Sequence, residues 1–202
     1  MENSNFKELI KSNILFYDNR VSIHGTSYKS LNWGSKESQN LRFKVLSSIG
    51  DFNRKKILDF GCGIGDYYSW LIENNFNVYY TGMDISSKMV LKAKERFSNV
   101  EFIQQDIFSK PLEKSYDYIF LSGVFTETNE LFFQKCITYL FENCTHGIGF
   151  NLLSKWYPHE SKSKKYEYVA SPIKTLNFCE GLSKKVVFRH DYHFRDFTIF
   201  LY

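Results

Sequence analysis

The sequence has little cysteine, little proline and no long hydrophobic run, and each shortage excludes a class of protein. Its four cysteines, at positions 62, 136, 144 and 179, form no C-x-x-C pair and no cysteine–histidine cluster with zinc spacing. The N-terminus lacks a basic region followed by an apolar run, and no stretch approaches the roughly 18 apolar residues of a membrane span. These absences predict a cytoplasmic protein with reduced thiols and no membrane partner.

A dense basic stripe is also missing. The net charge is only +4, and Lys and Arg alternate with Asp and Glu except around residues 162–165, so we expect no nucleic-acid partner. What the sequence does contain is aromatic: 20 Phe and 14 Tyr stand against 3 Pro in 202 residues. This composition predicts one packed globular domain and leaves the oligomeric state open.

Alternating glycines follow a buried strand in the segment 57–66, which reads ILDFGCGIGD. Glycine supplies positive φ and bare backbone, and the helix that follows directs free N–H groups and the positive end of its dipole at an anionic ligand. A dinucleotide fingerprint needs glycine where this chain has Asp66. The turn therefore predicts a nucleotide-like ligand and disfavours a dinucleotide.

Hydrophobic periodicity predicts the order of elements along the chain. Helices are expected at 4–18, 35–49, 65–74, 86–97, 129–142 and 171–180, and strands at 56–60, 77–84, 100–104, 116–121, 146–153, 184–190 and 195–202, with polar loops at 19–34 and 154–170. Four residues between the last two strands leave room only for a hairpin. The order predicts a doubly wound α/β fold whose seven-stranded, mostly parallel sheet ends in an antiparallel hairpin.

Three motifs in this order resemble those of class I S-adenosylmethionine-dependent methyltransferases. They are D-x-G-x-G-x-G at 59–65, Met83-Asp84-Ile85-Ser86 and Gln105-Asp106-Ile107. Asp84 falls at the end of the second strand, where a carboxylate can accept both ribose hydroxyls. The resemblance implies S-adenosylmethionine as cofactor, and cofactor-binding roles for Gly61, Cys62, Gly63, Asp84, Ile85, Asp106, Ile107 and Ser122.

Residues 1–50 are expected to form a helical lid over a methyltransferase domain at 51–202. Tyr28 or Trp33 could lie across the sulfonium of the cofactor, where cation–π attraction is worth roughly 0.5–2 kcal/mol. Arg42 could pair with the methionine carboxylate. The alternative is structural: Trp33 packs on the core and Arg42 is solvated.

Motifs near both ends resemble a group of small bacterial class I methyltransferases that act on small molecules, and with the core motifs they cover most of residues 28–202. They are Trp33-Gly34-Ser35, Glu37-Ser38-Gln39, Arg42-Phe43, Arg189-His190-Asp191-Tyr192 and Phe197-Thr198. His190 and His193 follow the sixth strand on its carboxyl side, where either could take a proton from the acceptor. A purely structural role for each histidine is the alternative.

The segment Leu121–Phe125 occupies the fourth motif, where the transferred methyl group should lie. It has neither an Asn-Pro-Pro-Tyr run nor an acidic cluster for magnesium, so no metal ion is expected. The sequence predicts methyl transfer to an oxygen or nitrogen of a small metabolite by in-line displacement. Alternatives are an RNA or protein methyltransferase, a catalytically idle S-adenosylmethionine-binding subunit, and a nucleotide-dependent oxidoreductase, which Asp66 and the hairpin disfavour.

Overall fold

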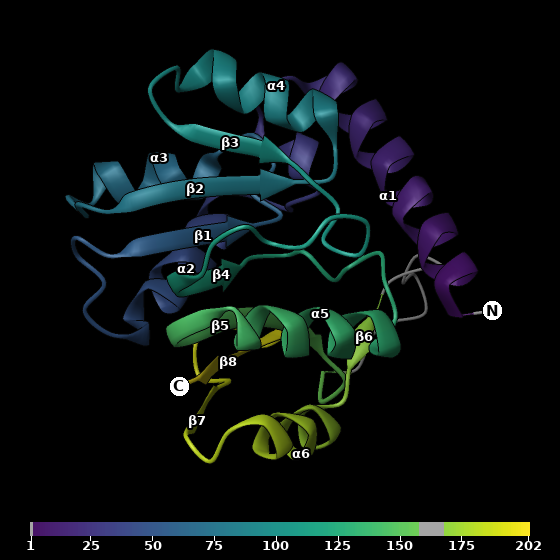
Figure 1. Cartoon of the computed structure of the whole chain (residues 1–202), viewed down its shortest axis with the longest axis vertical. Coiled ribbons are helices and arrows are strands. Elements are labelled where there is room, and N and C mark those ends of the chain that lie inside the picture. Colours follow the sequence, from purple (N-terminus) through teal and green to yellow (C-terminus); the bar gives the residue numbers. More distant parts are fainter. Residues whose placement is uncertain (1, 158–167) are drawn as a thin grey trace.

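The computed structural model describes residues 2–157 and 168–202, with side chains from residue 6 onward. Its centre is a sheet in the order β3-β2-β1-β4-β5-β8-β7, with β6 paired to β5 (Figure 1). The strands are β1 Lys56–Phe60, β2 Tyr79–Asp84, β3 Glu101–Gln104, β4 Tyr116–Leu121, β5 Cys144–Ser154, β6 Val169–Ala170, β7 Val186–Arg189 and β8 Asp196–Leu201.

The predicted seven strands are all present, and their directions are as expected. β1 to β5 pair in parallel, while β8 runs antiparallel to both β5 and β7. The doubly wound fold with its terminal hairpin is therefore confirmed. β6, at the end of the expected loop 154–170, is an addition: Leu153 pairs with Val169 and Ser154 with Ala170. Most of that loop lies outside the described residues.

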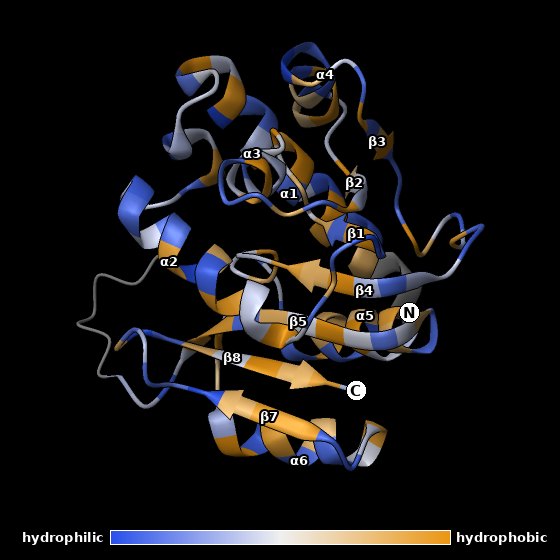
Figure 2. Ribbon diagram, turned by 90° about the vertical axis from the view of Figure 1, so that its left-hand side faces the viewer, coloured by the Kyte–Doolittle hydropathy of each residue, from blue (hydrophilic) through white to orange (hydrophobic). Residues whose placement is uncertain are grey.

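Helices cover both faces of the sheet. They are α1 Glu2–His24, α2 Lys36–Leu46, α3 Asp66–Glu73, α4 Ser87–Arg96, α5 Glu130–Glu142 and α6 Pro172–Leu182, with 3-10 turns at Tyr28–Leu31 and Ser47–Ile49. One buried cluster joins α2, α3 and α4 to one face, and the other joins α5 and α6 to the opposite face. The central strands are largely buried, and their hydrophobic residues are interrupted by polar ones, such as Asp59 in β1 and Asp117 in β4 (Figure 2).

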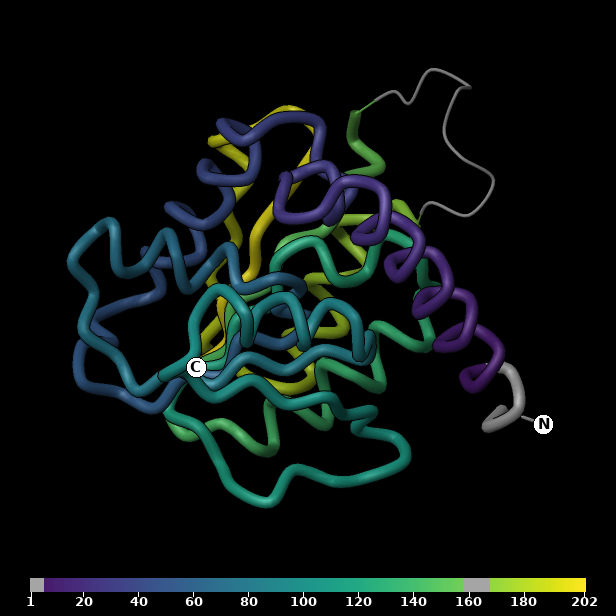
Figure 3. The backbone as a smooth tube through the Cα atoms, turned by 90° about the horizontal axis from the view of Figure 1, so that it is seen from above, coloured from purple at the N-terminus to yellow at the C-terminus, as the bar shows by residue number. Residues whose placement is uncertain are grey.

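The first helix is longer than its sequence pattern predicted. α1 continues to His24, so the expected loop 19–34 begins later, because Val21 stands one turn after Tyr17 and packs with Ile64 and Met89. α1 lies beside the carboxyl ends of the strands (Figures 1 and 3). A smaller correction concerns α6, which runs through Gly181 to Leu182 instead of ending before it.

Along the described chain, no helix has the length and apolar character needed to cross a membrane.

Candidate functional site

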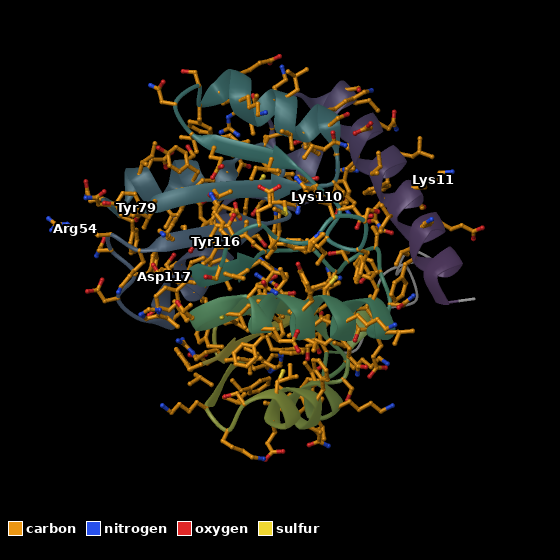
Figure 4. All side chains as sticks on the ribbon, viewed as in Figure 1. Lys11, Arg54, Tyr79, Lys110, Tyr116 and Asp117 are labelled. Atoms are coloured by element: carbon orange, nitrogen blue, oxygen red, sulfur yellow. The ribbon has the colours of Figure 1, made fainter. Side chains whose placement is uncertain are left out.

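A cavity lies at the carboxyl edge of the sheet, between α1 and the segments that follow β1, β2, β3 and β4. Figure 4 gives the orientation: Arg54, Tyr79 and Asp117 lie at the amino edge of the sheet, and Lys11 of α1 lies on the other side of the molecule. In open α/β sheets ligands bind at the carboxyl edge. The cavity includes eight of the predicted residues: Trp33, Gly61, Cys62, Asp84, Ile85, Asp106, Ile107 and Ser122.

The glycine turn after β1 has the backbone that its sequence predicted. Gly61, Gly63 and Gly65 have φ of 75°, 54° and 79°. A Cβ on Gly61 would lie 2.6 Å from Val124 Cγ2, and one on Gly63 would overlap the Leu31 side chain. Side chains are therefore excluded at both positions. Gly63 does not itself line the cavity, because Leu31 covers it.

The first N–H groups of the turn are engaged within the protein. Those of Gly61 and Cys62 both donate to the Met83 carbonyl, at 2.7 and 3.0 Å. The Gly63 N–H donates to Asp84 Oδ2 at 2.9 Å. These bonds tie the turn to β2, and the Cys62 N–H is already engaged within the protein. Burial raises the pKa of the Cys62 thiol well above the usual value, which leaves it protonated.

Asp84 is held in place at the end of β2. Its Oδ1 accepts the Ser86 N–H at 2.9 Å, and its Oδ2 accepts that of Gly63. Burial raises the pKa of Asp84, and these N–H donors act in the opposite direction by favouring the carboxylate. Both oxygens keep lone pairs that can accept the hydroxyls of a sugar.

The same end of the cavity is lined by Ile85, Asp106 and Ile107. The Asp106 carboxylate accepts the Phe108 N–H at 2.9 Å and the Ser109 hydroxyl at 2.6 Å. This turn fixes the loop after β3 beside Asp84. The arrangement forms an acidic and apolar pocket of the kind that suits a nucleoside.

Helix α1 contributes three cavity residues that the sequence analysis missed: Ile10, Asn13 and Tyr17. Asn13 Nδ2 donates to the Glu127 carbonyl at 2.9 Å and so ties α1 to the loop after β4. Burial, reinforced by Glu127 and Asp84, raises the pKa of Tyr17, which stays a neutral hydroxyl. Helical spacing identified the inward face of α1, but only the tertiary structure shows that part of that face covers a cavity.

Two more carboxylates, Asp59 and Asp66, also line the cavity, and both are 2% exposed. Asp66 pairs with Arg96 at 2.7 Å and accepts from Gln39 Nε2 at 3.0 Å. Asp59 accepts the Tyr80 hydroxyl at 2.5 Å, and burial raises the pKa of Asp59 to about 7. Four carboxylates, Asp59, Asp66, Asp84 and Asp106, thus line the cavity, which favours a ligand with positive charge.

Trp33 separates this cavity from a second one and lines both. The ring lies against Gly123, where a Cβ would come within 2.9 Å of Trp33 Cζ2. The second cavity is bordered by Thr126, Asn151 and Tyr168. Trp33 is therefore the partition between two adjoining spaces at the end of β4.

Arg42 lines the second cavity instead of the first. Its guanidinium forms a buried ion pair with Asp196 and lies 4.9 Å from the centroid of the Trp33 ring. The solvated alternative is therefore wrong for Arg42, which is 5% exposed. Tyr28, in the 3-10 turn, is half-buried and lines neither cavity.

The two histidines differ in their surroundings, and neither lines either cavity. His193 Nδ1 lies 3.5 Å from both Arg42 and Asp196 and accepts the Arg195 N–H at 3.1 Å. Burial and the Arg42 cation lower the pKa of His193, which favours the neutral ring. Because Nδ1 accepts the Arg195 N–H, the proton of the neutral ring is on Nε2. His190 packs among Trp156, Phe188 and Phe197, and within the described chain its buried Nε2 has no hydrogen-bond partner.

The sequence and the fold both have relatives. A family model described as "Methyltransferase domain" matches residues 51–183. A Mycobacterium tuberculosis protein that has been assigned as a methyltransferase, Rv1506c, is 32% identical over 154 residues, which are 71% of this chain and 90% of the relative. Phosphoethanolamine N-methyltransferase of Plasmodium falciparum is 28% identical over 148 residues, 69% of this chain and 55% of the relative.

Solved structures share the fold. DhpI in a complex titled DhpI-SAM-HEP superposes with a TM-score of 0.73 at 16% identity, over 95% of this chain and 96% of that one. Haemonchus contortus phosphoethanolamine N-methyltransferase 1, in complex with phosphoethanolamine and S-adenosylhomocysteine, gives a TM-score of 0.73 at 15% identity. That match covers 95% of this chain but only 48% of the nematode protein.

Proposed function

This chain belongs to the methyltransferase domain family, and we propose that it transfers a methyl group from S-adenosylmethionine to an oxygen or nitrogen of a small metabolite by direct, metal-independent displacement. It is an S-adenosylmethionine-dependent methyltransferase, and solved proteins of the same fold bind S-adenosylmethionine or its demethylated product. The small-molecule acceptor is supported by relatives and neighbours that act on phosphoethanolamine.

The main cavity fits this cofactor chemically. Bound there, S-adenosylmethionine supplies an electrophilic methyl group on a sulfonium, and it also carries a cationic ammonium. Asp84 can accept ribose hydroxyls, and Ile85 and Ile107 line the part of the cavity proposed for the nucleoside. Asp59 and Asp66 add two more carboxylates to the lining of the same cavity. The single observation that carries the proposal is that four carboxylates, Asp59, Asp66, Asp84 and Asp106, line one cavity beside the glycine turn.

Acceptor binding is assigned to the second cavity. It adjoins the first at Trp33 and Gly123, in the segment after β4 that the fourth motif occupies. Direct transfer requires the acceptor to reach the methyl group past the edge of the Trp33 ring, at the boundary that the two cavities share, where the indole helps to exclude water. Residues 1–50 then act as the predicted lid, since Asn13, Tyr17, Leu31 and Trp33 all line the main cavity.

Two groups beside the second cavity can take the proton of the acceptor. Asp196 lines that cavity, and burial raises the pKa of its carboxyl. His193 neighbours Asp196, but it must first release the Arg195 N–H from Nδ1 before that nitrogen can accept a proton. His190 would need a movement of the aromatic residues that surround it. We therefore propose His193, with Asp196, ahead of His190.

The test is transfer of a labelled methyl group into cell extract separated into RNA, protein and small molecules, with and without EDTA. Label in the small-molecule fraction that survives EDTA supports the proposal. Label in RNA or protein would support the rival acceptor classes, and no transfer despite tight cofactor binding would support an idle subunit. Once the acceptor is known, His193→Ala should slow transfer by about 100-fold or more with unchanged cofactor affinity, and His190→Ala should not.

A further inference from the structure

A tyrosine–carboxylate pair lies at the wall of the main cavity: Asp59 is the first residue of the glycine motif, whereas Tyr80 belongs to none of the cofactor motifs. Tyr80 on β2 donates its hydroxyl to Asp59 Oδ2 on β1 at 2.5 Å. The two strands are parallel with Ile57 opposite Tyr80, so Asp59, two residues further along, lies on the same face as that pair. Tyr80 is 8% exposed and does not itself line the cavity, whereas Asp59 does.

The Tyr80 ring is fixed by aromatic neighbours on both sides. Its centroid lies 4.9 Å from that of Tyr68 and 5.8 Å from that of Phe102. A ring held this way has its hydroxyl in one position, so the bond to Asp59 costs little side-chain entropy on folding. The bond also satisfies Asp59 Oδ2 and leaves Oδ1 as a further acceptor.

Asp59 is a buried acid without a cation of its own. Asp84 and Asp66 are the charged groups that act on it, and both oppose its ionisation, as burial does; the Tyr80 hydroxyl favours it. Tyr67 and Cys62, which also lie nearby, are neutral because burial raises the pKa of each. Asp66 has Arg96 as partner, but across the described residues no ion pair involves Asp59. A buried carboxylate of this kind is stabilised when a ligand brings a cation.

We propose that Tyr80 is a positioning residue of the cofactor site: it keeps the Asp59 carboxylate oriented and ionised so that Asp59 binds the ammonium group at the amino-acid end of the cofactor. The inference rests on the cofactor and not on the identity of the acceptor. It predicts that the amino-acid portion of the cofactor is bound more weakly as the pH falls toward 6, while the nucleoside portion is not.

The experiment compares two ligands by calorimetry between pH 5.5 and 7.5, below the pKa of α-amino groups, which is about 7.7–8.0. S-adenosylhomocysteine carries the ammonium group, and methylthioadenosine has the same nucleoside without it. Asp84 is expected to contact the nucleoside, which both ligands share. Any titration of Asp84 therefore changes both affinities equally and cancels in their ratio. In the wild type, the affinity for S-adenosylhomocysteine relative to that for methylthioadenosine should rise with pH across this range.

Tyr80→Phe removes the hydroxyl and keeps the ring. If this raises the pKa of Asp59 by about one unit, S-adenosylhomocysteine should bind about five- to tenfold more weakly between pH 6 and 7, with methylthioadenosine unchanged. Asp59→Asn should make the affinity ratio independent of pH. Tyr118→Phe is the matched control, since Tyr118 is an equally buried tyrosine on β4 that lines neither cavity.

Two results would overturn the proposal. One is an equal loss of affinity for both ligands in Tyr80→Phe, which would mean that Tyr80 only supports the shape of the cavity. The other is a ligand ratio that does not vary with pH in the wild type. Because Asp59→Asn tests the same carboxylate without touching Tyr80, the proposal stays testable even if Tyr80→Phe fails to fold.

Discussion

Replacing Asp84 by alanine should separate its binding role from its structural one. The carboxylate holds the Gly63 and Ser86 N–H groups, each at 2.9 Å, and lines the cavity where the ribose is expected. A hydrogen bond to a charged group is worth about 1.5–3 kcal/mol. Asp84→Ala should therefore weaken S-adenosylhomocysteine by about 10- to 150-fold, since 1.4 kcal/mol corresponds to a factor of ten.

The assay is calorimetric titration with S-adenosylhomocysteine, and with methylthioadenosine and its 2′-deoxy analogue, next to a thermal melt. The wild type should prefer the hydroxylated ligand by about tenfold or more, and Asp84→Ala should lose that preference. Asp51→Ala is the control, because Asp51 also accepts a backbone N–H, that of Asn53 at 3.0 Å, in a turn before β1. It should lower the melting temperature without changing any of these affinities. If Asp84→Ala costs less than about twofold in affinity, Asp84 only shapes the turn.

Three further predictions concern the lid, the partition and the buried acid. Deleting residues 1–34 should leave a folded sheet, because every strand begins after Lys55, but should reduce cofactor affinity, as titration of the truncated protein would show; full affinity would contradict the lid. Gly123→Ala should displace the Trp33 ring and change tryptophan fluorescence, and an unchanged spectrum would count against the contact. Burial raises the pKa of Asp59 to about 7, so folding takes up a proton there, and the folded protein loses stability as the pH rises from about 4 to 7. Asp59→Asn should therefore be more stable than the wild type by up to about 4 kcal/mol at pH 8 and equal to it near pH 4, as denaturant titration would show.

The glycine turn and the strand ends were determined by the sequence alone, because their causes are local. A βα turn is indicated by three features together: a short apolar run, glycines that need positive φ, and an acid at the end of the next strand. The structure accordingly has φ of 75° at Gly61 and a strand that ends at Asp84. The helix cap at Ser35 is local as well: its side chain accepts the Ser38 N–H at 3.1 Å.

Long-range contacts decided the rest. The expectation that Arg42 pairs with a ligand stays untested, but its guanidinium is already bound to Asp196, which is far away in the chain. Tyr17 follows a helical pattern that predicts a core residue, and it lines the cavity only because α1 lies at the carboxyl edge of the sheet. Periodicity identifies which face of an element is buried. What that face is buried against depends on residues that no local pattern encodes, and both the position of α1 beside the cavity and the Tyr80–Asp59 hydrogen bond follow from those distant contacts.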